Sequence, residues 1–418
     1  MELVLRPPSG NGPLDVKIKA VQKHLRGVPT GSPRLEELGW LFVAKARSSF
    51  DDNFYLQAEN CALLLDHAKP GSPAGLLLKG HVLVSTHRFA EAEAVAKTLV
   101  AARGLGFDYA LLGDALMEQG RLDSALTAYQ AMMDRKPGYQ AYARAAHMRW
   151  LHGDVEGASD MMHLAVTACS PRDAEAMAWA YTKHSAYQFQ LGQKKAAKSS
   201  LRSALGHMPN FPPAQYMRGR ISLQEGRTSA AVSDLTASTR AHSLPETQWA
   251  LAEALRSSGR PSSADSVESL LSAGGARMDP RTLSLFLATR KRSTQEAHSL
   301  ALRELAKRGD VFTHDAVAWA AYASGDLGSA ASHADSAMAR GTKDPRMSLH
   351  AGLIAKAAGR TELARTRLGA ARAQSQLLLP SERRLLDNAL ARPAGAGAAT
   401  NAAAPVTGRT ADSGPALR

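Results

Sequence analysis

Apolar residues between positions 109 and 137 follow the spacing of two paired helices. They recur every three or four residues, which places them on one face of a helix. The first set is Tyr109, Leu112, Gly113 and Leu116, and the second is Ala125, Leu126, Tyr129 and Met132. Gly120 and Arg121 between the two sets predict a turn, and Pro137 closes the second helix. Because glycine inside a helix costs about 1 kcal/mol relative to alanine, Gly113 indicates that the two helices approach closely there.

The turn signal of this unit, a glycine followed five residues later by an alanine, returns along the chain. It is found at Gly153/Ala158, Gly192/Ala197, Gly226/Ala231, Gly259/Ala264, Gly325/Ala330 and Gly359/Ala364. His87 with Ala92 marks an earlier turn, and a degenerate unit between Gly259 and Gly325 has Arg292 and Ser293 at its turn. The recurrence predicts tandem helix pairs, about nine or ten of them by the repeat length.

Residues 109–137 resemble the tetratricopeptide repeat, a helix pair of roughly 34 residues. Its signature is an aromatic residue, Leu-Gly, a turn, alanine, a second aromatic, a small residue and a final proline. These places hold Tyr109, Leu112-Gly113, Ala125, Tyr129 and Pro137, whereas Met132 replaces the usual small residue. The resemblance, to bacterial-type multi-repeat arrays, implies an all-α fold, a superhelical solenoid of tandem tetratricopeptide-like helix pairs. It also implies a non-catalytic scaffold or adaptor that binds a protein segment in a concave groove.

The ends of the chain depart from the repeat pattern. Residues 1–13 are rich in Pro and Gly, and we expect them to be disordered. An N-terminal helix and linker are predicted over residues 14–33, the repeat solenoid over 34–373, and a capping helix over 374–390. Ala, Gly, Pro, Ser and Thr dominate residues 391–418. Such a composition buries too little apolar surface to offset the entropy of ordering, so this tail is expected to be disordered.

Cysteine content and the first residues bear on the compartment. The two cysteines, Cys61 and Cys169, lie far apart, so neither a disulfide framework nor a paired-cysteine metal site is expected. The first eight residues hold Arg6 and two prolines, where an export signal would need an apolar core of about 7–15 residues. No stretch reaches the roughly 18 apolar residues of a membrane span. If Met1 is the true start, these features predict a soluble, cytoplasmic protein; a shortened gene model could have removed an export signal.

The residue types that carry catalysis do not form a recognisable constellation. Gly104 and Gly106 lack the rest of a dinucleotide fingerprint, and no glycine-rich phosphate loop ends in Gly-Lys-Ser/Thr. His147 and His152 are five residues apart and therefore point to different faces of a helix. No serine lies in a nucleophile-elbow motif. We therefore expect no catalytic, metal or cofactor site, and a protein that is not an enzyme.

A candidate binding surface follows from the repeat register. In such a solenoid the first helix of each pair lines the concave face, and large aromatic residues there are typical anchors for a protein partner. Projected onto the other units, the groove-facing positions are Phe107, Asp114, Met117, Trp150, Trp179, Phe189, Tyr216, Arg220, Trp249, Glu253, Arg256, Trp319 and Tyr322. The alternative interpretation is that these aromatics only fill gaps between neighbouring helices.

Some proteins of this family bind carboxy-terminal peptides through a clamp of lysine, asparagine and arginine on the first helices. The matching positions here hold Ala110, Asp114, Ala143 and His147. This set lacks the cations of the clamp, which argues against a ligand of that particular kind and leaves other peptides open.

The net charge of +13 and the pI near 9.8 favour an acidic partner, and an acidic protein is preferred here over nucleic acid because no recognised nucleic-acid module is present. Basic residues become denser toward the C-terminus: Arg281, Arg290, Lys291, Arg292, Arg303, Lys307, Arg308, Arg360, Arg365, Arg367, Arg372, Arg383 and Arg384. The alternatives to a protein-binding groove are therefore a nucleic-acid-binding solenoid and an enzyme-associated regulatory solenoid, either of which would use this basic surface.

Overall fold

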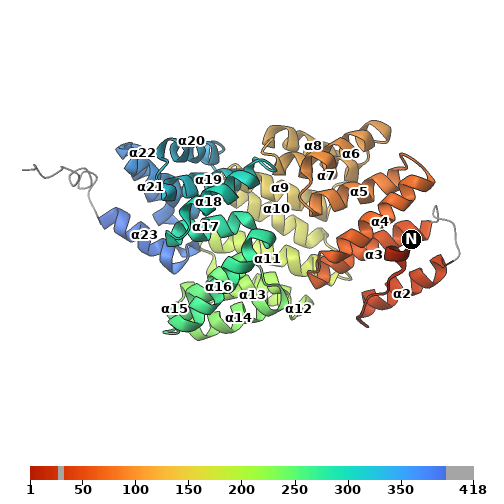
Figure 1. The fold of residues 1–418 in the computed structure, drawn as a ribbon, viewed down its shortest axis with the longest axis horizontal. Coiled ribbons are helices and arrows are strands. Elements are labelled where there is room, and N and C mark those ends of the chain that lie inside the picture. Colours follow the sequence, from red (N-terminus) through yellow and green to blue (C-terminus); the bar gives the residue numbers. More distant parts are fainter. Residues whose placement is uncertain (27–32, 392–418) are drawn as a thin grey trace, which may run out of the picture.

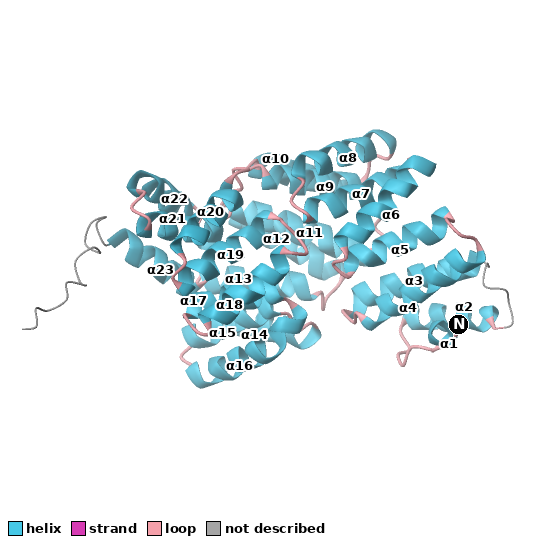
Figure 2. Cartoon of the chain, turned by 45° about the horizontal axis from the view of Figure 1, so that its top comes forward, coloured by secondary structure: helices cyan, strands magenta, loops and turns pink. Residues whose placement is uncertain are grey.

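The computed structural model describes residues 1–26 and 33–391. In these two ranges the chain forms 23 α-helices and one short 3-10 helix, η1, and contains no strand. The helices stack in an elongated array, with the N-terminus at one end and the last helix at the other (Figures 1 and 2). The prediction of an all-α solenoid is confirmed.

Twenty consecutive helices form ten pairs, whose bounds are as follows. They are α3 (Pro33–Ser49) with α4 (Asn53–Ala68), α5 (Pro73–Ser85) with α6 (Phe89–Ala102), α7 (Gly106–Glu118) with α8 (Leu122–Arg135), α9 (Tyr139–Leu151) with α10 (Val155–Ala168), α11 (Ala174–Gln190) with α12 (Lys194–His207), α13 (Pro212–Gln224) with α14 (Thr228–Ala241), α15 (Pro245–Ser257) with α16 (Pro261–Met278), α17 (Pro280–Arg290) with α18 (Thr294–Leu305), α19 (Val311–Ser324) with α20 (Leu327–Met338), and α21 (Pro345–Ala357) with α22 (Thr361–Ala373). The flanking elements are α1 (Glu2–Leu5), α2 (Pro13–Leu25), η1 (Ser375–Leu377) and α23 (Pro380–Ala391).

The turns within the pairs form where the sequence predicts them. Gly120 adopts a left-handed φ of 76°, which glycine tolerates because it has no Cβ atom. His87 and Ser293 replace glycine in the two irregular units and also adopt positive φ values, of 60° and 44°. The close helix approach expected at Gly113 is confirmed, because a Cβ atom at that position would overlap the ring of Tyr129 in the paired helix.

The row of helix pairs winds back on itself, so that α7 to α9 lie against α19 to α21. Leu116, Leu151 and Met148 share one apolar cluster with residues of the later helices, among them Met338 and Met347. Polar contacts connect the same segments. They are Asp123 Oδ2 with Arg340 Nη2 at 2.9 Å, Glu118 with Arg308 at 3.5 Å, and Thr342 Oγ1 donating to the carbonyl of Leu151 at 2.5 Å.

A glycine substitution would test this contact between turns of the superhelix. Gly120→Ala would place a Cβ atom against the carbonyl oxygen of Gly309, whereas Gly226, with a similar φ of 74°, faces open space. A left-handed backbone conformation costs a residue with a Cβ atom roughly 1–2 kcal/mol. Gly226→Ala should therefore lower the free energy of unfolding, measured by urea denaturation, by this amount. Gly120→Ala should lose at least about twice as much, because backbone on both sides must move. Equal losses in the two variants would contradict the inter-turn contact.

The expectation of a disordered start is wrong for residues 2–5. Val4 is fully buried against α2 and α4, and the side chain of Gln22 donates hydrogen bonds to the carbonyls of Val4 and Arg6, both at 2.9 Å. The segment is ordered because these contacts anchor it, although Pro and Gly surround it. The tail expected to be disordered, residues 391–418, lies outside the described residues apart from Ala391.

Candidate functional site

Three adjoining cavities follow the inner side of the superhelix and form what we call the concave channel. The N-terminal chamber, of about 1000 Å³, is lined by α3, α4, α5, α7, α9 and α11. A middle chamber of about 290 Å³ lies between α11, α13 and α15, and a C-terminal chamber of about 330 Å³ is lined by α9, α11, α13, α19, α21 and η1. Trp179 lines the first two chambers, and Lys183, Tyr216 and Glu246 line the last two, so neighbouring chambers share parts of their walls.

Seven of the residues predicted to bind a partner line this channel. They are Phe107 and Asp114 in the N-terminal chamber, Trp179 and Tyr216 at the junctions, and Trp150, Phe189 and Arg220 in the C-terminal chamber. Ala110, Ala143 and His147 also line it. Phe189 is only 1% exposed and packs mainly in the core.

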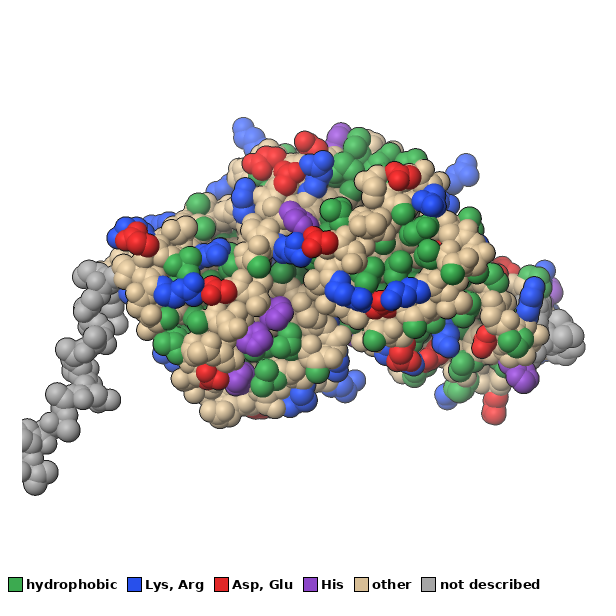
Figure 3. Space-filling view, turned by 90° about the horizontal axis from the view of Figure 1, so that it is seen from above, with side chains coloured by type: hydrophobic (Ala, Val, Ile, Leu, Met, Phe, Trp, Pro, Cys, Tyr) green, Lys and Arg blue, Asp and Glu red, His purple; other side chains and the backbone are tan. Residues whose placement is uncertain are grey.

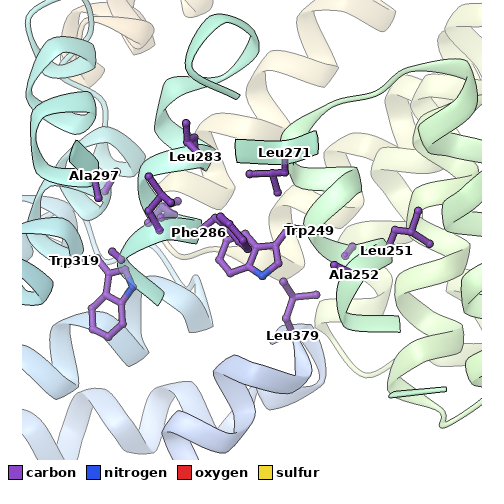
Figure 4. Close-up of a cluster of buried hydrophobic side chains, with 14 of the residues drawn as sticks. Trp249, Leu251, Ala252, Leu271, Leu283, Phe286, Ala297, Trp319 and Leu379 are labelled. Carbon is purple, nitrogen blue, oxygen red and sulfur yellow. The ribbon is translucent and has the colours of Figure 1, made fainter. Parts of the chain in front are cut away.

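Six predicted residues do not line the concave channel: Met117, Trp249, Glu253, Arg256, Trp319 and Tyr322. Trp249 is fully buried, with Phe286 on one side and Leu379, just before α23, on the other (Figure 4). Trp319 is buried under His350, whose ring lies parallel at 4.1 Å, and it stacks on Tyr322 at 5.3 Å.

The two charged residues of this group are used within the fold. Glu253 accepts hydrogen bonds from Ser381 and pairs with Arg290. Arg256 pairs with Asp265 and Glu268. Trp249 and Trp319 therefore do not face the groove, because α17, α21 and the segment before α23 cover them.

Sequence reasoning missed several channel residues. Trp40, Tyr55 and Tyr139 line the N-terminal chamber, and Phe312 and Arg346 the C-terminal one. Trp40 and Tyr55 belong to the first, irregular helix pair, where the repeat register could not be projected. Lys183 could have been found, because it follows Trp179 by four residues and so lies on the same face of α11.

Ion pairs hold the walls of the N-terminal chamber. The guanidinium of Arg144 makes two bonds to the carboxylate of Asp114, from Nε to Oδ1 at 2.8 Å and from Nη2 to Oδ2 at 2.6 Å. Tyr129 donates its hydroxyl to the same carboxylate at 2.8 Å. Arg47 pairs with Oε1 of Glu175 at 2.8 Å, which joins α3 to α11 across the channel. These contacts fix the positions of the helices that form the chamber.

Lys183 is the exception to this pairing. Its ammonium group lies 5.8 Å from the ring centre of Trp179, and no carboxylate of the described residues lies within ion-pair distance of it. Lys183 is exposed to the solvent of the channel. Desolvation by the nearby walls lowers the pKa of Lys183, while Glu246 opposes the shift. The same walls and the Lys183 charge lower the pKa of His147 to about 4, so that imidazole is neutral at pH 7. Lys183 therefore offers a positive charge without a fixed counter-ion.

The C-terminal chamber ends at η1. Gln190 donates from Nε2 to the side chain of Gln374 at 2.9 Å, and Gln376 donates to the carbonyl of Gln190 at 3.2 Å. Arg220 bonds the carbonyl of Leu377 and donates from Nη1 to the hydroxyl of Tyr216 at 2.7 Å. This segment thus forms the end wall of the channel.

The basic residues of the C-terminal half are largely neutralised by the fold. Eight of the thirteen form ion pairs: Arg281, Arg290, Arg292, Lys307, Arg308, Arg360, Arg365 and Arg372. Figure 3 shows the same mixture on one face, where blue and red side chains lie next to each other. A contiguous strip for phosphates would need uncompensated charge on one face, and these pairs do not favour it.

The described residues were also compared with the requirements of a metal site and of a membrane span. Within residues 1–26 and 33–391, no group of three or more His, Cys, Asp and Glu side chains is arranged to hold a metal ion. No helix of the described part of the chain is long and apolar enough to cross a membrane.

Comparison with known proteins identifies the repeat. The family model of the tetratricopeptide repeat matches residues 77–140 and 110–174. No curated protein sequence matches the chain. Among solved structures, the human IFIT1 dimer with PPP-AAAA is 12% identical, with 90% of this chain and 94% of that chain covered and a TM-score of 0.48.

Two other solved structures have a similar sequence identity but lower TM-scores. The APC/C hetero-tetramer Cut9-Hcn1 is 14% identical over 91% of this chain and 90% of that chain, with a TM-score of 0.38. YrrB, described as a TPR protein with an unusual peptide-binding site, is 14% identical over 47% of this chain and 95% of that chain, with a TM-score of 0.29. At these identities the likeness concerns the fold alone.

Proposed function

We propose that this chain is a non-catalytic scaffold that binds an extended segment of a partner protein in the concave channel. The family model of the tetratricopeptide repeat matches residues 77–140 and 110–174. Repeats of this family are typical of protein-interaction scaffolds, and the channel is the place where this chain could hold such a segment. The observation that carries the proposal is the row of three adjoining chambers, of which the first two share Trp179 and the last two share Lys183, Tyr216 and Glu246.

The channel has the properties of a site for a protein segment. It is lined by large aromatic side chains with a few polar groups between them, the composition typical of binding pockets. Several charged side chains of its wall are held by ion pairs, such as Arg144 with Asp114 and Arg47 with Glu175, so these parts of the wall are fixed before a partner arrives. A preformed site loses little conformational entropy on binding, which favours affinity. Lys183, which has no fixed counter-ion, could pair with a carboxylate of the segment.

Affinity capture with a matched pair of variants tests this proposal. Trp179 lies at the junction of two chambers, and removing a tryptophan anchor typically costs an interface at least about 2 kcal/mol, roughly thirtyfold in Kd. Trp179→Ala should therefore lose the partner that the intact protein captures. The segment of that partner is then synthesised, and its Kd for both proteins is measured by calorimetry.

Tyr322→Ala is the matched control, because Tyr322 is a half-buried aromatic that lies outside the channel. It should keep the partner and a Kd within about twofold of the intact protein, a difference below 0.5 kcal/mol. Melting curves confirm that both variants are folded at the temperature of the assay. Retention of the partner by Trp179→Ala, or equal loss in the two variants, would contradict binding in the channel.

A further inference from the structure

The N-terminal chamber combines aromatic walls with an excess of negative charge. Rings of Trp40, Tyr55, Tyr139 and Trp179 face it, from four different helices. Tyr139 and Trp179 meet edge to face, with their ring centres 6.1 Å apart. The face of an aromatic ring carries a negative quadrupole and attracts a cation placed over it. The walls alone would therefore accept either an apolar or a cationic side chain.

The charges in the chamber separate these two possibilities. Four carboxylates line it, from Asp52, Asp114, Asp173 and Glu175, against the two guanidinium groups of Arg47 and Arg144. Both guanidinium groups are already engaged, by Glu175 at 2.8 Å and by Asp114 at 2.6 Å. Two carboxylates remain, and a further cation would compensate them.

Asp52 and Asp173 are these two carboxylates. Asp52 precedes α4, but its side chain does not cap the helix and makes no ion pair with any described residue. Asp173 accepts one hydrogen bond, from the backbone N–H of Ala176 at 3.0 Å, and pairs with no lysine or arginine of the described ranges. The charge of Asp173 acts on groups inside the chamber. Burial raises the pKa of Tyr139, and the negative charges of Asp173 and Glu175 add to that shift.

The histidines of the chamber do not supply the missing positive charge. Burial, with a contribution from Arg47, lowers the pKa of His81 to about 4. Burial also lowers the pKa of His242, although Asp52 opposes the shift. Both imidazoles are therefore mainly neutral at pH 7, and the chamber keeps its negative excess.

We propose that the N-terminal chamber binds a lysine or arginine side chain of the partner segment, between the aromatic rings and the carboxylates of Asp52 and Asp173. This inference rests on the proposed function and specifies the residue that the partner must present. It runs against the net charge of the chain, +13, which by itself favours an acidic partner. Beyond Trp179, the ammonium of Lys183 repels a cation, so the basic side chain is confined to the N-terminal end of the channel.

Four peptide sublibraries test the inference with the full-length protein. Each contains nonapeptides with acetylated and amidated ends, eight randomised positions and a central residue fixed as Arg, Lys, Gln or Glu. The protein is immobilised, and the recovery of each sublibrary is measured. Asp52 and Asp173 are exposed, and a solvent-accessible charge pair is worth up to about 1 kcal/mol. We therefore expect about fivefold higher recovery with central Arg or Lys than with Gln. Recovery with Glu should be the lowest.

A charge-neutralised variant and its control decide the role of the two carboxylates. In Asp52→Asn/Asp173→Asn both side chains keep their size, and asparagine caps a helix as well as aspartate does. This variant should lose the preference for Arg and Lys. Glu156→Gln/Asp160→Asn removes two exposed carboxylates of α10, outside the channel, and should keep it.

The outcomes also separate this inference from the function on which it rests. Recovery that depends on Trp179 but is equal for the Arg, Lys, Gln and Glu sublibraries would overturn the cationic preference and leave channel binding supported. Recovery of no sublibrary above a protein-free surface would overturn both. A preference for Arg and Lys that survives in Asp52→Asn/Asp173→Asn would also overturn the inference, because the selecting charges would lie elsewhere.

Discussion

An Arg290→Met variant is expected to lose about 3–5 kcal/mol of its free energy of unfolding, because the substitution leaves the buried carboxylate of Glu253 without a counter-ion and removes the nearest of three cations from that of Glu268. Nη2 of Arg290 lies 2.9 Å from Glu253 and 2.6 Å from Glu268, and its side chain is only 14% exposed. The two carboxylates are 1% and 2% exposed. Since water cannot reach them, the attraction lost on substitution is not replaced by hydration.

The network around Arg290 connects four helices, so the substitution of Arg290 should destabilise all four. Glu253 lies on α15, Glu268 on α16 and Arg290 at the end of α17. Ser381, at the start of α23, donates its hydroxyl to Glu253 at 2.6 Å and its backbone N–H at 3.1 Å. Urea denaturation followed by circular dichroism measures the loss. Hydrogen exchange should show increased opening of these four helices first.

Two further variants make this prediction specific. Arg365→Met removes an arginine whose pair with Glu362 is exposed, at 72% and 78%, and should change stability by less than about 0.5 kcal/mol. Combining Arg290→Met with Glu253→Gln removes the uncompensated charge and should restore part of the loss, whereas Glu268 keeps its pairs with Arg256 and Arg292. An Arg290→Met variant within about 1 kcal/mol of the parent protein would show that the buried carboxylates find other partners or become protonated.

The sequence predicts whatever is repeated within one helix pair. The turn glycines, the small residue at Gly113 and the inward direction of Trp179 and Tyr216 all follow from contacts between residues fewer than about 34 positions apart. Such contacts recur in each unit, so the register of one unit can be carried to the next. The channel residues contributed by α7, α9, α11 and α13 were predictable for this reason.

What the sequence could not predict depends on contacts between distant units. Trp319 occupies the same repeat position as residues that line the channel, but α21 covers it through His350. The pair Asp123–Arg340 and the hydrogen bond from Ser381 to Glu253 join residues more than 100 positions apart. No periodicity encodes these pairings, because each occurs once. The same limit explains why Val4, which packs against α2 and α4, was expected to be disordered.

The substitution Trp249→Ala should likewise cost about 3–5 kcal/mol of stability, the loss typical of deleting a large buried aromatic side chain. Trp249 is fully buried, its ring meets Phe286 edge to face at 5.7 Å, and the guanidinium of Arg346 lies 4.9 Å above it. Its indole Nε1 has no hydrogen-bond partner among the described side chains and backbone groups, so it contributes through packing alone. Thermal and urea denaturation measure the effect, and Trp249→Phe, which leaves a smaller cavity, should lose less.

Comparison of Trp249 with Trp179 distinguishes packing from recognition within one protein. Both tryptophans occupy first helices of their pairs, and the repeat pattern assigns both to the groove. If the buried position is structural, Trp249→Ala should bind the partner segment with a Kd within about twofold of the parent protein, at a temperature where it is folded. It should also loosen α23, because Leu379 packs on the same indole. Trp179→Ala should show the reverse, with stability largely kept and binding lost. Loss of binding in Trp249→Ala without loss of stability would mean that α23 leaves this site in solution and that the channel extends to α15.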